Sequence, residues 1–509
     1  MRHQKLLTAI CIIILLSFGN SLLAQSNNKV MNEMYRPQVH FSPKEHWIND
    51  PNGMVYYKGT YHLFFQYHPY SSVWGPMHWG HATSKDLIHW EQQPIAIYPD
   101  SLGTIFSGSA VVDKNNTSGF GKNGQPPLVA IFTQHDTIGE KAGRNNFQNQ
   151  SIAYSVDDGK TWIKYAGNPV VKNPGLRDFR DPKIMWYEPQ KKWIMSLAVK
   201  DNITFYSSPD LKNWTRESDF GEGRGAHGGG WECPDLFVLD DNGKQRWVLL
   251  VNLNPGAPNI GSGTQYFVGD FDGKTFTSDQ KDTRWLDYGP DNYAGITWSN
   301  TGKRKILIGW MTNWMYANQV PTDKWKNALT IPRELKLKHV GNDIFLTSEP
   351  VVELKAIEIK PVLLNNVMVD KAMDLSKKTG KIILPCRLDL SLKQANNFTL
   401  ELSNETGEKL LIGYDKKMNQ YFIDRMASGK VDFQNGFAAK HVAPRLTDNA
   451  AINISIIADE SSVELFADDG LTIMTEIFFP AKPYNQIHLL SDEKVLVTKL
   501  RYAALKGIW

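Results

Sequence analysis

The sequence predicts an all-β protein in which a β-propeller precedes a β-sandwich, and three observations support this prediction. A turn motif that ends in an aromatic residue recurs through the first part of the chain. Strand-like segments dominate, whereas the sequence lacks long amphipathic helical patterns. The composition changes near residue 340, since every tryptophan except Trp509 lies at or before Trp325.

The recurring motif joins an acidic or glycine-containing turn to an aromatic residue. Its copies are residues 84–90 (SKDLIHW), 155–162 (SVDDGKTW), 208–214 (SPDLKNW) and, more weakly, 269–276 (GDFDGKTF). Each copy follows a strand-like run, and the copies lie roughly 50 to 70 residues apart, a period typical of propeller blades. Asp-Gly hairpins occur in any β-rich protein. Four copies with the aromatic residue in the same place favour a repeat.

The second part of the chain consists of short alternating strands of ordinary composition. Examples are FTLELSN, KLLIGYD, INISIIAD and SSVELFAD. Short strands at this spacing are typical of a β-sandwich. We therefore expect a propeller over residues 33–345, a linker around residues 345–360 and a sandwich over residues 360–509.

Size and charge limit the function classes. A chain of 509 residues is too long for one core, so two domains are expected. The net charge is +3 and no long run of Lys or Arg occurs, which argues against nucleic acid or an anionic membrane as a partner. The oligomeric state is not predicted.

The first residues have the pattern of a secretory signal. A basic start precedes the apolar stretch of residues 6–18, and Leu22, Leu23 and Ala24 form a small-residue cleavage site. The apolar stretch is short for a membrane span. Cys11 lies inside this stretch, so a lipid anchor is not expected. We predict a signal peptide over residues 1–24 and a secreted or periplasmic protein with no membrane span.

Three carboxylates stand in unusual surroundings. They are Asp50 in WINDPNG, Asp181 in FRDP and Glu232 in WECPD, and each lies within two residues of a proline and beside an aromatic residue or an arginine. Asp-Pro-Asn-Gly is also a strong turn signal, because Pro fixes φ and Asn and Gly accept positive φ. Inner strands of propeller blades gather around one axis, so carboxylates from different blades are expected to converge at one mouth.

These motifs, together with their order, resemble glycoside hydrolase family 32, the β-fructosidases that include invertases, levanases and inulinases. The motifs, in order, are HFSPKEHWINDPNG, YHLFFQYHP, WGPMHWGHATSKDLIHW, FSGSAV, FRDPKI, WECPDLF, DYGPDNYAGITW, IGWMTNW and SSVELFADDG. The resemblance extends over nearly the whole mature chain. It implies a five-bladed β-propeller followed by a C-terminal β-sandwich.

The resemblance also implies catalytic roles for the three carboxylates. Asp50 would be the nucleophile that attacks the anomeric carbon of a fructosyl unit, and Glu232 the general acid and then the base. Asp181 would hydrogen bond the sugar in the transition state. Hydrolysis with retention needs two carboxyl groups about 5 to 5.5 Å apart. An acid must stay protonated, so we expect Trp231 and Asp50 to raise the pKa of Glu232.

The resemblance implies further sugar contacts, because amides and hydroxyls match sugar hydroxyls and aromatic faces pack on the ring. The expected contacts are Asn49, Gln66, Trp74, Phe106, Ser107, Arg180, Tyr293 and Trp314, and Trp47 is a further candidate. Core packing is the alternative for each aromatic residue. Arg180 would either bind hydroxyls or keep Asp181 ionised, and a structural ion pair is the alternative.

Several other signals are not interpreted as sites. Residues 223–228 spell G-x-G-x-x-G, but they do not lie between a strand and a helix, so we expect a loop that leads to Glu232. His78 and His81 lack a third metal ligand and are interpreted as packing residues. Cys233 is expected to shape its strand. Neither a metal nor a cofactor is predicted.

The predicted function is that of a secreted retaining β-fructosidase acting on levan, inulin or sucrose. Exo action with release of fructose is favoured, because the mouth of a propeller axis suits chain ends. Endo cleavage and fructosyl transfer remain open on the same scaffold. The alternative from another class is a carbohydrate-binding propeller without catalysis, which a missing carboxylate would indicate, and none of the three is missing.

Overall fold

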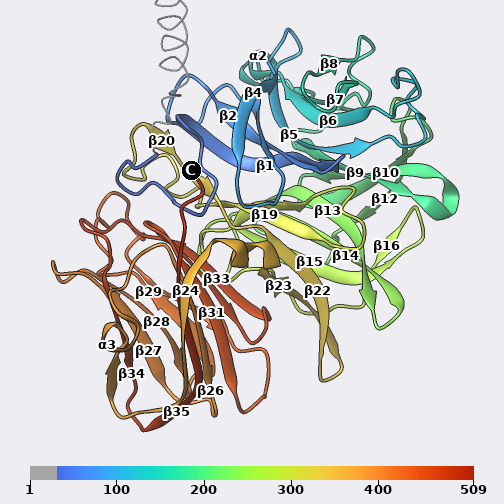
Figure 1. The fold of residues 1–509 in the computed structure, drawn as a ribbon. Coiled ribbons are helices and arrows are strands. Elements are labelled where there is room, and N and C mark those ends of the chain that lie inside the picture. The colour runs from blue at the N-terminus through green and yellow to red at the C-terminus, as the bar shows by residue number, and fades with distance from the viewer. Residues whose placement is uncertain (1–30) are drawn as a thin grey trace, which may run out of the picture. The chain divides into compact units, whose positions relative to one another are not determined.

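The computed structural model describes residues 31–509, so the predicted signal peptide lies outside the described residues. Within that range the strands form seven sheets, five in the propeller and two in the sandwich (Figure 1). This confirms the predicted fold class. None of the helices in residues 31–509 has the length and hydropathy that a membrane crossing requires.

The five propeller sheets follow one another along the chain. The first blade contains β1 (His46–Tyr57), β2 (Thr60–His68), β3 (His78–Ser84) and β4 (Glu91–Ile97). The second contains β5 (Thr104–Val112), β6 (Leu128–His135), β7 (Gln148–Ser155) and β8 (Ile163–Lys164), with helix α2 (Thr137–Lys141) between β6 and β7. The third contains β9 (Phe179–Tyr187), β10 (Lys192–Val199), β11 (Asn202–Ser208) and β12 (Thr215–Phe220), with η1 (Glu188–Gln190) between β9 and β10. The fourth contains β13 (Gly230–Asp241), β14 (Lys244–Asn254), β15 (Gly263–Phe271), β16 (Phe276–Thr277) and β17 (Arg284–Trp285). The fifth contains β18 (Tyr293–Thr297), β19 (Ile306–Met311), β21 (Ala328–Leu329), β22 (Arg333–Val340) and β23 (Asp343–Pro350).

The innermost strands of the five blades form a closed ring. Strands β1, β5, β9, β13 and β18 each contact the next, and β18 contacts β1. The short strand β20 (Trp325–Lys326) pairs in parallel with β1, so the first blade combines strands from both ends of the propeller sequence. The ring therefore gathers side chains that are far apart in the chain around one axis.

The recurring turn motif joins the third strand to the fourth strand in four blades. In each turn an aspartate accepts hydrogen bonds from backbone N–H groups, as Asp86 does from Ile88 and His89. In the three copies that end in tryptophan, its indole N–H donates to a carbonyl inside the same turn, at 3.1 Å for Trp90, 3.2 Å for Trp162 and 3.0 Å for Trp214. This confirms the repeat. The fifth blade has instead a short turn between β22 and β23 that lacks the motif.

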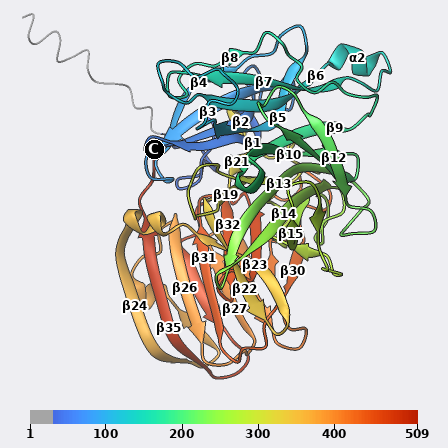
Figure 2. The same ribbon diagram turned by 90° about the vertical axis from the view of Figure 1, so that its right-hand side faces the viewer.

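Two six-stranded sheets face each other in the C-terminal part, which η2 (Val352–Ile357) joins to the propeller. One sheet has the order β24 (Glu358–Val369), β35 (Val495–Leu505), β26 (Cys386–Leu392), β31 (Ile452–Ala458), β32 (Ser462–Ala467) and β33 (Thr472–Ile477) (Figure 2). The other has the order β25 (Ala372–Asp374), β34 (Gln486–Leu490), β27 (Phe398–Ser403), β28 (Lys409–Asp415), β29 (Gln420–Asp424) and β30 (Lys440–Pro444), with α3 (Ser376–Thr379) after β25.

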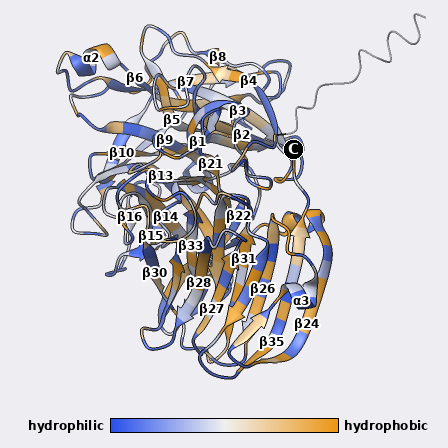
Figure 3. Cartoon of the chain, turned by 90° about the vertical axis from the view of Figure 1, so that its left-hand side faces the viewer, coloured by the Kyte–Doolittle hydropathy of each residue, from blue (hydrophilic) through white to orange (hydrophobic). Residues whose placement is uncertain are grey.

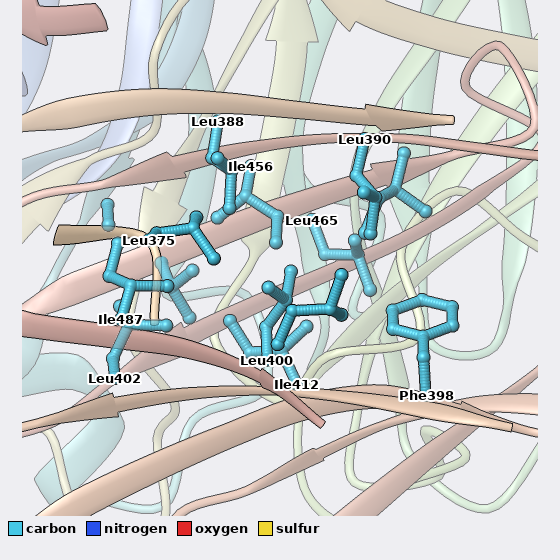
Figure 4. Close-up of a cluster of buried hydrophobic side chains, with 14 of the residues drawn as sticks. Leu375, Leu388, Leu390, Phe398, Leu400, Leu402, Ile412, Ile456, Leu465 and Ile487 are labelled. Atoms are coloured by element: carbon cyan, nitrogen blue, oxygen red, sulfur yellow. The ribbon is translucent and has the colours of Figure 1, made fainter. Parts of the chain in front are cut away.

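Alternating side chains build the core between these two sheets. Along β26 every second residue is buried, beginning with Cys386. The hydropathy colours alternate along this strand (Figure 3). The buried set contains Leu388 and Leu390 from one sheet and Leu400 and Ile412 from the other (Figure 4). Alternation of this kind is what a strand with one buried face requires.

A buried network of charged groups connects the propeller to the sandwich. Arg333 at the start of β22 is fully buried, and its guanidinium contacts Asp287 Oδ2 at 2.9 Å and Glu464 of β32. Glu464 also accepts a hydrogen bond from His40 Nε2 at 2.8 Å, and the other ring nitrogen of His40 lies 2.7 Å from Asp459 Oδ2. Burial alone lowers the pKa of His40, but its bonds to the two carboxylates raise it to about 9.

This network predicts a loss of stability at alkaline pH. The pKa of His40 is raised to about 9 in the folded protein, against about 6.5 when unfolded, so its contribution is complete below pH 6.5 and is lost as pH rises through 9. Compared with His40→Gln, the native chain should lose about 3 kcal/mol of unfolding free energy over this window. Denaturant titrations between pH 6 and 9.5 measure the difference, and parallel curves for the two proteins would contradict the assignment.

Candidate active site

The predicted site residues lie at corresponding places on the inner strands of the ring. Asp50 is on β1, Ser107 on β5, Asp181 on β9, Glu232 on β13 and Tyr293 on β18. Each lies in the first half of its strand. The ring therefore brings the three carboxylates to the same end of the propeller axis from three different blades.

Each inner strand is irregular at this place. The pairing register between the inner strand and the next strand shifts near Asp50, Ser107, Asp181, Glu232 and Tyr293. A bulge of this kind bends a strand and turns a side chain out of the regular alternation. The prolines that follow the carboxylates fit such positions, because they have no N–H to donate to the ladder.

The WINDPNG segment is part of a strand, contrary to the turn that its composition predicts. All of it lies within β1, and the register with β2 shifts twice along it. Gly53 has a φ of +57°, and a Cβ there would come within 2.5 Å of the Trp79 ring. The turn-forming residues therefore produce bulges in a continuous strand, because pairing with β2 prevents reversal of the chain.

Asp50 is held by hydrogen bonds to both of its oxygens. Ser107 Oγ donates to Oδ2 at 2.6 Å, and Asn49 Nδ2 donates to Oδ1 at 2.9 Å. Asn49 is held in turn by the indole N–H of Trp47, which donates to its Oδ1 at 2.8 Å. These contacts fix the orientation of the Asp50 carboxylate.

Asp181 lies deeper and shares a neighbour with Asp50. Its side chain is buried, its φ is +64°, and its Oδ2 accepts the backbone N–H of Cys233 at 3.1 Å. The Cys233 sulfur lies 3.6 Å from Asp181 Oδ2 and 3.7 Å from Asp50 Oδ2. Burial raises the pKa of the thiol well above its usual value, so the sulfur stays protonated between the two carboxylates.

Glu232 contacts two hydrogen-bond donors. Arg180 Nη2 donates to Oε1 at 3.0 Å, and the Tyr293 hydroxyl donates to Oε2. Arg180 also forms an ion pair with Asp178 at 2.6 Å, while it acts on Asp181 through charge. Burial raises the pKa of Tyr293 well above its usual value, so the phenol remains a donor.

Trp231 does not form the apolar wall that the sequence predicts beside Glu232. It is fully buried, and its indole N–H donates to Ala226 O at 3.0 Å. Trp231 packs with hydrophobic residues from β10, β11, β14 and β15. Adjacent residues of a strand point to opposite faces, so Trp231 faces the core when Glu232 faces the axis. The residue beside the Glu232 carboxylate is instead Tyr293, whose hydroxyl donates a hydrogen bond to it.

The three carboxylates influence one another electrostatically. Burial raises the pKa of Asp181 to about 7, with the charge of Arg180 opposing this and the charges of Glu232 and Asp50 adding to it. Burial also raises the pKa of Asp50, and the hydrogen bonds from Ser107 and Asn49 oppose this. The site thus concentrates negative charge around a single arginine, which is typical of functional sites.

The predicted aromatic sugar contacts fall into two groups. Trp47 is fully buried and stacks with Trp314 at a centroid distance of 6.1 Å, so it helps to fix the orientation of the Trp314 ring. Trp74 is 45% exposed and makes an edge contact with Phe106, which stacks on His135 at 4.3 Å. Trp74 and Trp314 thus present accessible surface, whereas core packing is correct for Trp47.

Other predicted residues have different surroundings. Gln66 is buried on β2, and its amide nitrogen has no hydrogen-bond partner among residues 31–509. His81 stacks on Phe64 at 4.3 Å, as expected of a packing residue. The glycines of residues 223–228 lie in the loop between β12 and β13.

Sequence reasoning missed two contributors to the site. Asp178 pairs with Arg180, and Thr133 Oγ1 accepts the backbone N–H of Asp181 at 3.0 Å. Asp178 directly precedes β9 and could have been inferred, because residues two apart in extended backbone share a face. Thr133 lies on β6 of another blade and leaves no local signal.

The chain is similar to known proteins over nearly its whole length. The model of the glycosyl hydrolases family 32 N-terminal domain matches residues 40–350, and that of the family 32 C terminal matches residues 354–504. A levanase of Bacillus subtilis is 45% identical over 522 residues, covering 100% of this chain and 76% of that protein. An extracellular exo-inulinase of Aspergillus niger is 41% identical over 499 residues, covering 90% and 92%.

Solved structures agree with the sequence relatives. The crystal structure of the exo-inulinase from Aspergillus awamori has a TM-score of 0.84 and 37% identity, covering 94% of this chain and 100% of that one. The β-fructofuranosidase from Schwanniomyces occidentalis complexed with fructosyl-erythritol has a TM-score of 0.85 and 32% identity, covering 94% and 100%. Matches to both family models over nearly all described residues, together with these relatives, establish that the chain belongs to glycoside hydrolase family 32.

Proposed function

We propose that this protein is a retaining β-fructosidase that hydrolyses fructans, with Asp50, Glu232 and Asp181 as the catalytic carboxylates. The observation that supports this most strongly is their convergence from β1, β13 and β9 at one end of the ring, with Asp50 fixed at both oxygens. Relatives named levanase and exo-inulinase support fructan as the substrate class. No cofactor enters the proposed reaction.

Asp50 is proposed as the nucleophile because its carboxylate is oriented and its anion is stabilised. Ser107 and Asn49 donate one hydrogen bond to each oxygen, and these bonds offset part of the effect of burial on its pKa. A fixed carboxylate attacks the anomeric carbon without first being ordered, which lowers the entropic part of the barrier. The product of this step is a covalent fructosyl-enzyme.

Glu232 is proposed as the acid that protonates the departing oxygen and then as the base that activates water. Arg180 and Tyr293 each donate a hydrogen bond to its carboxylate. Both donors stabilise the anion that Glu232 becomes after it gives up its proton. Their interaction therefore strengthens as the leaving group departs, which is the requirement for catalysis by differential binding.

Changing Glu232 should affect substrates according to their leaving groups. With Glu232→Ala, kcat on sucrose and levan should fall by about 10³-fold, because these leaving groups need a proton. An aryl fructoside with a nitrophenolate leaving group should lose far less in the first step. Values of kcat/KM on both substrates, which report the first step alone, test this, with Glu222→Ala in the loop before β13 as the control. Equal losses on both substrates would contradict the acid role.

Asp181 is proposed to bind the sugar hydroxyls more tightly in the transition state than in the ground state. Asp181→Asn keeps the shape but removes the charge, so kcat should fall by about 10²-fold or more with little change in KM. Steady-state kinetics on sucrose separate the two parameters. A rise in KM at constant kcat would mean that Asp181 binds ground state and transition state equally.

The substrate and mode are proposed as exo hydrolysis of levan or inulin, with sucrose as a further substrate. Asn49, Gln66, Trp74, Phe106, Ser107, Arg180, Tyr293 and Trp314 are the proposed substrate-binding residues. Trp74 is exposed and Trp314 is partly exposed, which favours their direct contact with the sugar, and Tyr293 in addition donates its hydroxyl to Glu232. Relatives named as extracellular support the proposal that residues 1–24 direct the protein out of the cytoplasm.

A timed product analysis tests the function as a whole. Purified protein is incubated separately with levan, inulin and sucrose, and the sugars are resolved by chain length. Fructose alone at the earliest times is expected for exo hydrolysis, and the relative rates identify the preferred linkage. Early oligosaccharides would mean endo cleavage or fructosyl transfer. Binding without any product would mean that this propeller only binds carbohydrate.

A further inference from the structure

A second cavity lies at the opposite ends of the inner strands from the carboxylates. Its volume is about 490 Å³, within the range of about 300 to 1,000 Å³ that is typical of small-molecule sites. The later residues of the inner strands line it, among them Val111 of β5, Lys183 of β9, Asp235 of β13 and Thr297 of β18. A strand rises about 3.3 Å per residue, so the cavity is separated from the carboxylates by roughly 10 Å.

Asp235 is a buried carboxylate that is only half satisfied. Its Oδ2 accepts hydrogen bonds from the backbone N–H of Thr297 at 2.6 Å and from its hydroxyl at 2.8 Å, and it lies 3.2 Å from Lys183 Nζ. Its Oδ1 is buried and has no hydrogen-bond partner among residues 31–509. A buried acceptor of this kind is costly unless a donor is supplied.

Lys305 lines the same cavity and is partly buried. Its ammonium forms no hydrogen bond or ion pair within the described part of the chain. Burial lowers the pKa of Lys305, the charge of Asp235 raises it and that of Lys183 lowers it. Lys183, by contrast, donates to Thr297 O and pairs with Asp235. The cavity therefore combines a buried acceptor that has no donor among residues 31–509 with an ammonium that has no protein acceptor in the same range.

Aromatic side chains complete the wall. Trp186 lines the cavity and is half-buried, and Trp193 beside it is held by an edge contact at 5.1 Å. Trp193 is anchored by its indole N–H, which donates to Thr117 Oγ1 at 2.8 Å. Anchored aromatic surface next to polar groups is typical of sites for ligands that have both hydroxyl groups and an apolar face.

We propose that this cavity binds one neutral saccharide unit, with its hydroxyls on Asp235 and Lys305 and its ring against Trp186. A hydroxyl both donates and accepts, so it satisfies Asp235 Oδ1 and Lys305 together. A phosphate dianion has at most one O–H to donate, whereas a sugar ring presents several hydroxyls that can donate to Asp235 Oδ1. One water molecule fills about 30 Å³. A few waters bound to the polar groups would therefore fill only a small part of the 490 Å³ cavity, which leaves room for a larger ligand. The inference does not depend on the catalytic roles of the carboxylates.

Lysine labelling of the full-length protein tests the proposal. An acetylating reagent is applied with and without fructose, and the label on each lysine is quantified by peptide mass spectrometry. Labelling of Lys305 should slow about fivefold at fructose equal to four times Kd, because the occupied fraction is protected. Lys303, two residues away and exposed, is the matched control and should not change. Protection by inorganic phosphate but not by fructose would overturn the saccharide assignment.

A variant and a second measurement complete the test. Trp186→Ala should abolish the protection of Lys305 by fructose and leave the rate of sucrose hydrolysis unchanged, which also shows that the propeller is folded. Crystals soaked in fructose should show a sugar ring between Asp235 and Lys305. Ordered water alone in the cavity at saturating fructose would overturn the proposal, whatever the labelling rate of Lys305.

Discussion

Replacing Asp50 with alanine is expected to lower kcat for levan, inulin and sucrose by about 10⁴-fold or more, because no covalent intermediate can then form. Substrate binding should persist, since the hydroxyl and aromatic contacts remain. Burial and the neighbouring charge of Glu232 both raise the pKa of Asp50, so removing it relieves a cost and should not unfold the propeller. Steady-state kinetics and a thermal unfolding curve measure both effects.

The control and a direct observation make this result specific. Asp158→Ala removes an exposed carboxylate in the turn between β7 and β8 and should keep native kcat. In Glu232→Gln, hydrolysis of the intermediate is slowed, so an activated fructoside should leave one fructosyl unit attached to the peptide that contains Asp50. Label on another residue, or more than about 1% residual activity in Asp50→Ala, would assign the nucleophile elsewhere.

The largest expected effect on stability comes from Arg333. Arg333→Met keeps much of the volume but leaves Asp287 and Glu464 buried without their main cation. Removing one partner of a buried ion pair typically costs about 3 to 5 kcal/mol, because an uncompensated charge stays in a low-dielectric interior. The midpoint of denaturant unfolding should fall accordingly. His40 partly compensates at Glu464, so the loss should be larger above pH 9 than at pH 6.

Arg304 supplies the matched control for this prediction. It also pairs with two carboxylates, Glu334 and Glu353, but its side chain is 31% exposed. Solvent screens such pairs, so Arg304→Met should cost less than about 1 kcal/mol. Similar losses for the two variants would mean that burial does not determine the strength of the Arg333 network.

Local features of this fold were predictable from the sequence, and long-range ones were not. The turn motif is self-contained, because Asp86 and Trp90 bond within their own turn, so its repetition indicates blades without further information. The three carboxylates were found from motifs and their order. The orientation of Trp231 was accessible from strand alternation, although the motif alone suggested a wall beside Glu232.

The contacts that the sequence could not indicate form only when the ring of blades closes. The sequence around Asp50 has the composition of a turn, and only its pairing with β2 shows that it forms a bulge in a strand. Tyr293 meets Glu232 across a blade boundary, and Arg333 meets Glu464 across 131 positions of sequence. Such contacts follow from the assembled ring and from its packing on the sandwich, and neither composition nor periodicity records them.

The double origin of the first blade makes the contacts of β1 depend on residues that are synthesised much later. Strand β1 pairs with β20, and His40 just ahead of β1 contacts residues 419 and 424 positions later. Strand β1, which holds Asp50, is synthesised early, whereas its partner β20 and the partners of His40 are synthesised much later. The contacts around the first propeller strand are therefore complete only once Asp459 and Glu464 have been synthesised.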